Sequence, residues 1–136
     1  MTLSGAQTRE LLEAAARVRE RAHAPYSNFP VGAAVLDDQG RIHVGCNVEN
    51  ASYPQGTCAE TSAIAAMVAG GGKRIRAILV IGEGEGLCTP CGACRQRISE
   101  HADDETPVLV AQGDRVRATF TLEQLLPHSF GPENLK

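Results

Sequence analysis

The chain has 136 residues, of which 43% are hydrophobic and 21% are charged. This length and composition predict one folded domain over residues 1–136 with a sizeable core, and they exclude the disordered class. Its 13 basic and 16 acidic side chains give a net charge of −3 without a basic patch, which argues against a nucleic-acid partner and favours a small neutral substrate.

The predicted elements alternate between helices and strands. Apolar side chains recur at helical spacing from Leu11 to Ala22, residues 37–40 are typical of a hairpin turn, and glycines 70–72 end a helix. In chain order we expect a helix at 4–22 that opens with a Ser4–Gln7 capping box, strands at 31–36 and 41–46, a helix at 58–69, a strand at 75–81, a helix at 90–101, strands at 107–111 and 116–120, and a short helix at 122–126. This order predicts a three-layer α/β/α fold with a five-stranded mixed sheet, in which helical crossovers join parallel neighbours.

Two short segments carry most of the chemical information: Cys58-Ala59-Glu60 and Cys91-Gly92-Ala93-Cys94. A Cys-x-x-Cys pair and a distant third cysteine supply three soft ligands for zinc. Three protein ligands leave the fourth position open for water, which distinguishes catalytic zinc sites from structural ones. Glu60, two positions after the first cysteine, is placed to move protons to and from that water.

Both cysteine segments are expected at the start of a helix. Thr57 is predicted to cap one helix, and Thr89 the other, with Pro90 in the first helical position. A spacing of three puts Cys91 and Cys94 on one helix face. The positive end of each helix favours the thiolate form that zinc binds. We therefore predict a zinc site where two helix starts converge.

Simpler interpretations of the same residues explain less. Thr57 and Glu60 are also spaced as a capping box, but a cap explains none of the cysteines. A redox Cys-x-x-Cys would need neither Cys58 nor Glu60. A structural zinc site needs a fourth ligand, and the four histidines have no ligand-like spacing: His23, His43, His101 and His128.

No segment has the character of an export signal or a membrane span. The segment Met1 to Gln7 lacks the charged and apolar regions of a secretory signal, and no apolar run approaches the roughly 20 residues that cross a bilayer. We therefore expect a cytoplasmic protein with no membrane partner. In that compartment the five cysteines are expected to be reduced thiols or metal ligands rather than disulfides.

The Cys-x-Glu and Pro-Cys-x-x-Cys motifs resemble the signature of the zinc-dependent nucleoside and nucleobase deaminases, which implies a hydrolytic deamination. In that reaction zinc lowers the pKa of its bound water, and the resulting hydroxide adds to the amine-bearing carbon of the base, which in cytosine is C4. Glu60 is expected to take the water proton, deliver it to the ring nitrogen and help the amine leave as ammonia.

Along nearly its whole length the sequence resembles the small cytidine deaminases of the three-cysteine, homotetrameric type. Besides the Cys-x-Glu and Pro-Cys-x-x-Cys motifs, the resemblance covers residues 25–34, 47–53, 90–96 and 125–133. It implies one Zn²⁺ per subunit and conversion of cytidine or deoxycytidine to uridine or deoxyuridine plus ammonia, in pyrimidine salvage. It also implies a homotetramer in which subunits share their sites.

The resemblance assigns substrate contacts to matching positions. Asn47 and Glu49 would bind the ribose hydroxyls, and side chains two apart in an extended segment do point the same way. The backbone of Ala59 would help hold the base. Three aromatic side chains would complete the pocket, one from the same subunit and two from a neighbour: Phe29, Tyr53 and Phe130.

One position departs from the resemblance. Many relatives have arginine directly after the glutamate, whereas this chain has Thr61. Three thiolates on a divalent ion leave a net charge of −1, which weakens the ion's ability to acidify water. We expect Arg95, next to Cys94, to offset this charge, helped by the two helix N-termini.

Two alternatives stay open from the sequence. A deaminase of another small aminated substrate, such as blasticidin S, would share the three-cysteine motif, although residues 47–50 fit a free nucleoside better. A non-catalytic zinc-binding assembly module would use Glu60 only as a cap, worth about 1 kcal/mol.

Overall fold

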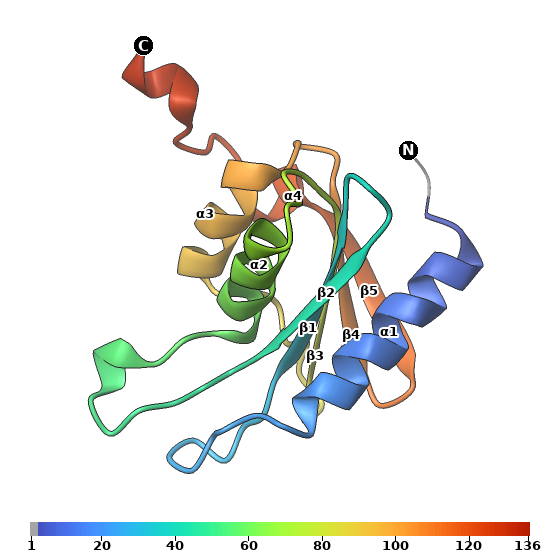
Figure 1. Cartoon of the computed structure of the whole chain (residues 1–136), viewed down its shortest axis with the longest axis vertical. Helices are drawn as coiled ribbons and strands as arrows, with labels where there is room; N and C mark the ends of the chain where they lie inside the picture. The colour runs from blue at the N-terminus through green and yellow to red at the C-terminus, as the bar shows by residue number, and fades with distance from the viewer. Residues whose placement is uncertain (1–2) are drawn as a thin grey trace.

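The computed structural model describes residues 3–136, so the first two residues of the Met1–Gln7 segment lie outside the described part. Five strands form one sheet between two layers of helices (Figure 1). The helices are α1 (Gly5–Arg19), α2 (Ala59–Ala69), α3 (Gly92–His101) and α4 (Leu122–Leu125), with the 3₁₀ helices η1 (Tyr53–Gln55) and η2 (Pro132–Leu135). The strands are β1 (Gly32–Asp37), β2 (Ile42–Cys46), β3 (Ile75–Gly82), β4 (Pro107–Gln112) and β5 (Arg115–Thr121). The predicted α/β fold with a five-stranded sheet is confirmed.

The sheet is mixed, with the strand order β2-β1-β3-β4-β5. Strands β3 and β4 are parallel, and all other neighbours are antiparallel. Helix α3 is the crossover that joins the parallel pair, as predicted, and α2 connects β2 to β3 across β1. The two helices that follow the cysteine segments therefore flank the central strand β3 in the chain: α2 leads into it and α3 leads out of it.

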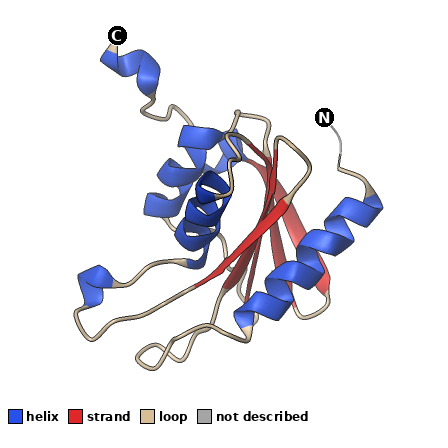
Figure 2. Ribbon diagram, viewed as in Figure 1, coloured by secondary structure: helices blue, strands red, loops and turns tan. Residues whose placement is uncertain are grey.

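Each face of the sheet is buried beneath helices. Because successive side chains on a strand point to opposite faces, Val80 packs in a cluster with Met67 of α2 and Ile98 of α3. Its neighbour Leu79 packs on the other face with Leu11 of α1. Helix α1 covers one face alone, while α2 and α3 lie side by side on the other (Figure 2). Within residues 3–136, no helix combines the length and apolar character needed to cross a membrane.

The start of α1 follows the prediction, and its end does not. Ser4 and Gln7 form the expected capping box, in which each backbone amide donates to the other's side chain at 3.0 Å. The helix ends at Arg19 rather than Ala22, because the amides of Arg21 and Ala22 bond to carbonyls three positions earlier. Such bonds form a tighter turn than the α-helix.

A close backbone approach fixes α2 against β2. A Cβ atom on Gly45 would lie 2.3 Å from the amide nitrogen of Ala63 and 2.6 Å from the carbonyl oxygen of Ala59. Only glycine allows this contact, since real Cβ atoms do not come so near to backbone atoms. Gly45 therefore sets the position of the helix that begins after Cys58.

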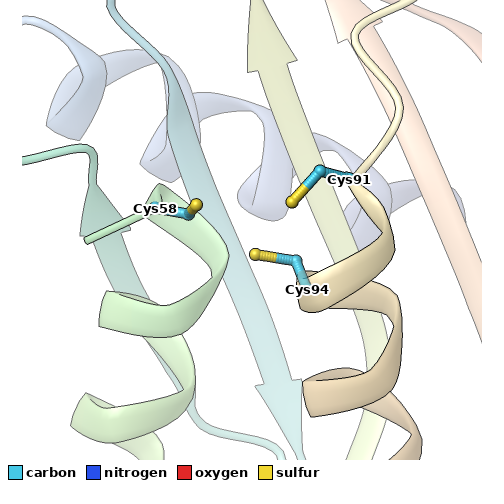
Figure 3. A group of neighbouring side chains, drawn as sticks. All are labelled: Cys58, Cys91 and Cys94. Carbon is cyan, nitrogen blue, oxygen red and sulfur yellow. The ribbon is translucent and has the colours of Figure 1, made fainter. Parts of the chain in front are cut away.

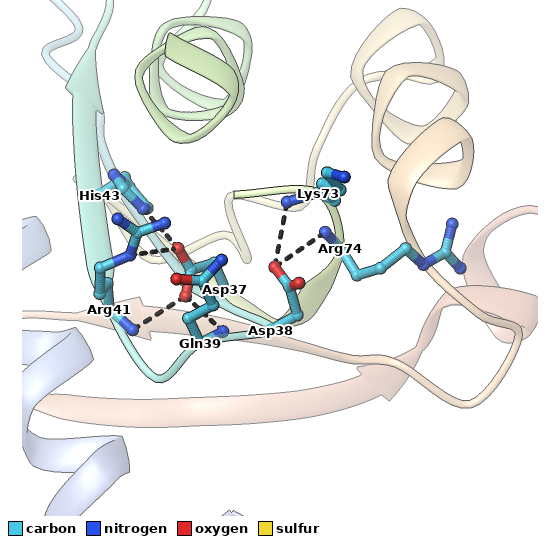
Figure 4. A network of polar contacts seen from close by, with 7 residues as sticks. All are labelled: Asp37, Asp38, Gln39, Arg41, His43, Lys73 and Arg74. Carbon is cyan, nitrogen blue, oxygen red and sulfur yellow. Dashed lines mark hydrogen bonds and ion pairs between the residues drawn. The ribbon is translucent and has the colours of Figure 1, made fainter. Parts of the chain in front are cut away.

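A buried carboxylate holds the turn between β1 and β2 (Figure 4). Asp37 Oδ1 accepts hydrogen bonds from the backbone amides of Gln39 at 2.8 Å and Arg41 at 2.9 Å. Its Oδ2 accepts from Arg41 Nε at 3.2 Å and His43 Nε2 at 2.8 Å. Burial alone would raise the pKa of Asp37, but these hydrogen bonds lower it to about 2. The neighbouring Asp38 accepts two backbone hydrogen bonds from the segment before β3.

Candidate metal centre

Three thiol groups converge between the starts of α2 and α3 (Figure 3). The Sγ atoms of Cys58, Cys91 and Cys94 lie within 4.8 Å of one another, and no other such cluster of potential metal ligands occurs in residues 3–136. Tetrahedral zinc with Zn–S bonds of about 2.3 Å places its sulfur atoms about 3.8 Å apart. Small side-chain movements would therefore bring these thiols to zinc geometry, and three soft donors suit that ion.

The three thiols differ in their electrostatic environment. Burial raises the pKa of Cys58, and it raises the pKa of Cys94 to about 12, where the charge of Glu60 adds repulsion. The pKa of Cys91 is lowered, mainly because the backbone amide of Cys94 donates a hydrogen bond to it. A divalent ion would stabilise all three thiolates together. The chemistry of the donor set thus fits zinc.

Helices α2 and α3 begin later than predicted, and the prediction that Thr57 and Thr89 cap them was wrong. The amide and carbonyl of Thr57 pair with Val48 at 2.9 and 3.0 Å, which keeps Thr57 extended and outside the helix. The Thr89 hydroxyl accepts a hydrogen bond from a later arginine side chain instead of capping α3. The N-cap positions are occupied by the cysteines themselves, Cys58 and Cys91, in extended conformation. Each helix therefore begins directly behind a thiol.

Glu60 lies in the first turn of α2 and is almost fully buried, with 5% of its surface exposed. Burial raises the pKa of its carboxyl group, and the charge of Arg97 partly offsets that effect. The capping box with Thr57 is absent, because Cys58 holds the N-cap and makes no side-chain cap bond. The structure therefore does not support a role for Glu60 as a helix-capping residue.

The segment around Glu49 lies beside the first cysteine segment. Val48 forms bridges with Thr57 on one side and His23 on the other. The Oε1 atom of Glu49 accepts hydrogen bonds from the backbone amides of Tyr26 at 2.9 Å and Ser27 at 3.1 Å, and Oε2 accepts one from the Ser27 hydroxyl. The pKa of Glu49 is lowered, chiefly by the Ser27 side chain. Glu49 is thus held as a carboxylate.

Asn47 and Phe29 belong to the same assembly of loops. Asn47 Oδ1 accepts from the amide of Val31 at 2.8 Å, and Nδ2 donates to the carbonyl of Phe29 at 3.0 Å. The Phe29 ring is 40% exposed and lies against the end of β3, where a Cβ on Gly82 would meet its Cζ at 3.2 Å and the sulfur of Cys88 at 2.7 Å. Asn47 therefore fixes the backbone that carries Phe29.

A cavity of about 360 Å³ opens next to these loops. It is lined by Tyr26, Ser27, Glu49, Asn50, Tyr53 and Gly56, and the three cysteines do not line it. Tyr53 is 74% exposed, and its ring meets that of Tyr26 edge-on at 5.8 Å. Phe130 is 58% exposed, and its carbonyl accepts a hydrogen bond from Gln96, two positions after Cys94. In a single chain, the side chains of Tyr53 and Phe130 are therefore exposed to solvent.

Two arginines of α3 lie near the cysteines. Arg95 donates to the carbonyls of Pro90 at 2.7 Å and Leu125 at 2.9 Å, and to the Thr89 hydroxyl at 3.3 Å. It ties the loop before α3 to the end of α4. Arg97, which sequence reasoning did not select, approaches Cys94 Sγ to 4.0 Å. The spacing of three between Cys94 and Arg97 on a predicted helix was the signal that could have identified it.

Comparisons with known proteins agree with this geometry. The family model for the cytidine and deoxycytidylate deaminase zinc-binding region matches residues 6–110. Cytidine deaminase from Sporosarcina psychrophila is 41% identical over 126 residues, which cover 93% of each chain. The crystal structure of cytidine deaminase from Burkholderia pseudomallei is similar with a TM-score of 0.84 and 41% identity, covering 94% of this chain and 100% of that one. The structure from Mycobacterium leprae is 40% identical, covers 93% and 100%, and has a TM-score of 0.78.

Proposed function

Since this chain belongs to the cytidine and deoxycytidylate deaminase family, we propose that it catalyses the hydrolytic deamination of cytidine and deoxycytidine to uridine and deoxyuridine with release of ammonia. The observation that carries the proposal is the cluster of three thiols within 4.8 Å, with the buried Glu60 two residues after Cys58. Three ligands and one proton-transferring group are what this chemistry needs.

In the proposed reaction, one zinc ion per chain is held by Cys58, Cys91 and Cys94. When bound, zinc supplies a Lewis acid that lowers the pKa of a coordinated water. Glu60 takes the proton of the attacking water and delivers it to the ring nitrogen of the base. It then carries a proton to the departing amine. The burial that raises the pKa of Glu60 suits this role, since a group that shuttles protons must exist in both states.

We propose that the loops beside the cysteines bind the nucleoside. The Glu49 carboxylate accepts hydrogen bonds from the ribose hydroxyls, and Asn47 Nδ2 donates its second hydrogen to a ribose hydroxyl oxygen. Phe29 lines the pocket, and the backbone of Ala59 holds the base. The hydrogen bonds that fix Glu49 and Asn47 support these roles, because preorganised polar groups lose little freedom on binding.

Assembly is part of this proposal. Tyr53 and Phe130 are 74% and 58% exposed, which is unusual for large aromatic side chains. We propose that the chain, a single domain, forms a homotetramer in which these two rings reach a neighbouring subunit's pocket. We also propose that Arg95 contributes positive charge near the zinc site, and that the enzyme works in cytoplasmic pyrimidine salvage.

A substrate panel tests the proposal. Zinc-loaded protein is incubated separately with cytidine, deoxycytidine, cytosine, cytidine 5′-monophosphate and blasticidin S, and ammonia and the deaminated product are quantified. We expect turnover of the two nucleosides and little turnover of the free base or the phosphate. Turnover of blasticidin S alone would contradict the nucleoside assignment. Absence of any turnover by zinc-loaded protein would contradict the enzymatic role.

A further inference from the structure

Three thiolate ligands would carry more negative charge than one divalent metal ion balances. Three thiolates and a divalent cation carry a net charge of −1, and Cys94 is fully buried, with 0% exposure. Negative charge in such a site needs compensation by nearby donors or cations. The environment of Cys94 shows which residues are available for that purpose.

Two side chains outside the cluster approach the sulfur of Cys94. Thr61 Oγ1, from α2, lies 3.7 Å away, and Arg97 Nη1, from α3, lies 4.0 Å away. Thr61 offers a dipole and no charge. Within residues 3–136, Arg97 is the one basic side chain at hydrogen-bonding distance from a sulfur of the cluster.

Arg95, the other candidate, directs its donors elsewhere. All three of its nitrogens donate to groups outside the cluster, at 2.7 to 3.3 Å. Its guanidinium group hydrogen-bonds two carbonyls and one hydroxyl, so it holds the loop before α3 and makes no hydrogen bond to a sulfur of the cluster. Arg97 has no other hydrogen-bond partner among the described residues. It lies one turn after Cys94 on the same helix face.

We propose that Arg97 is a positioning and charge-compensating residue of the zinc site, which strengthens zinc binding by offsetting the excess negative charge that Thr61 leaves uncompensated. This inference rests on the proposed zinc-dependent function. Charge compensation is thereby assigned to Arg97 on α3, three positions after Cys94, and not to position 61 on α2. It also separates the two arginines, since Arg95 holds the loop before α3 and Arg97 faces the sulfur.

The test is zinc affinity, measured by competition with a chromophoric chelator near neutral pH. Removal of a group that supports a metal ligand typically lowers metal affinity by about 10- to 100-fold. We expect a loss in that range for Arg97→Gln and a much smaller loss for Arg97→Lys, which keeps the charge. Arg76→Gln is the matched control, because Arg76 is exposed at the far end of β3 from Gly82 and its loss changes the net charge equally.

A second-site variant distinguishes charge from packing. Adding Thr61→Arg to Arg97→Gln puts a cation beside the same sulfur from α2, and we expect affinity to return toward that of the wild type. Cobalt-substituted samples give an independent signal, since thiolate-to-cobalt absorption reports whether all three sulfurs still bind. The proposal is overturned if Arg97→Gln binds zinc as tightly as the wild type does, or if Arg76→Gln loses as much zinc affinity as Arg97→Gln. It is also overturned if the double variant binds zinc no more tightly than Arg97→Gln. None of these readouts needs turnover, so failure of the proposed activity would be seen separately.

Discussion

The hydroxyl of Ser27 donates a hydrogen bond to the carboxylate of Glu49, although the two residues are 22 positions apart in the chain. The same hydroxyl accepts a hydrogen bond from the amide of Phe29 at 3.1 Å. Ser27 therefore connects a carboxylate proposed to bind ribose with the backbone of an aromatic ring proposed to line the pocket. Both proposed contacts depend on one small side chain.

Replacing Ser27 should weaken substrate binding more than chemistry. A hydrogen bond to a charged group contributes about 1.5–3 kcal/mol, so we expect Ser27→Ala to raise the KM for cytidine about tenfold or more while kcat changes little. Ser27→Thr keeps the hydroxyl and is expected to retain most of the affinity. Steady-state kinetics of both variants check this. An unchanged KM in Ser27→Ala would show that Glu49 does not depend on this bond.

Zinc removal should destabilise the protein. A ligand present at about 100 times its dissociation constant adds about 2.7 kcal/mol, which for a domain of this size corresponds to roughly 10 °C in Tm. We expect chelator-treated protein to unfold at a Tm lower by about that amount, and added zinc to restore it. Cys58→Ser should lose most of the response, and Cys46→Ser, outside the cluster, should keep it. A Tm that zinc does not change would contradict the site.

The contact between β2 and α2 should tolerate no side chain at position 45. Because a Cβ on Gly45 would overlap the backbone of α2, we expect Gly45→Ala to cost about 1–3 kcal/mol in the free energy of unfolding. Activity should fall as well, since the displaced helix carries Glu60. Chemical denaturation measures the first effect. Gly5→Ala is the control, because nothing lies within 4 Å of a Cβ there, and equal stability of both variants would refute the prediction.

The buried Asp37 should make stability depend on acid pH. Its pKa in the folded protein is about 2, below its ordinary value of 3.8, so the unfolded state binds the proton more readily. The stabilisation is fully present above about pH 4 and is lost as the pH falls from about 4 to about 2; it amounts to on the order of 2 kcal/mol. Asp37→Asn should be less stable near neutral pH and should lack this part of the pH dependence. Urea denaturation of both proteins across that range measures it, and parallel curves would contradict the assignment.

Local patterns in the sequence were sufficient for the architecture. The order of elements and the helical crossover between β3 and β4 follow from hydrophobic periodicity and from the glycines and turn residues between elements. The capping box of Ser4 and Gln7 is formed as the spacing predicts. The three cysteines were recognised because their spacing is specific to zinc chemistry, and the fold brings them together.

The details that were missed depend on contacts between distant segments. Thr57 has the residue type of a helix cap, but its pairing with Val48 in a neighbouring segment keeps it extended. Ser27 could not be assigned to Glu49 without knowing how the loops fold together. Arg97 was missed because it is not adjacent to a cysteine in the sequence, whereas helical geometry brings the residue three positions after Cys94 to within 4.0 Å of the sulfur.

The most direct test of the central claim compares the wild type with Glu60→Gln, each loaded with zinc, in one assay that follows the conversion of cytidine to uridine by ultraviolet absorption. The zinc content of both samples is measured beforehand. We predict one zinc per chain in each protein, conversion by the wild type, and a loss of at least about 100-fold in kcat for Glu60→Gln, because general acid–base groups contribute about 10²–10⁴-fold. Equal rates in the two proteins would show that Glu60 transfers no proton. No conversion by the zinc-loaded wild type would contradict the deaminase assignment itself.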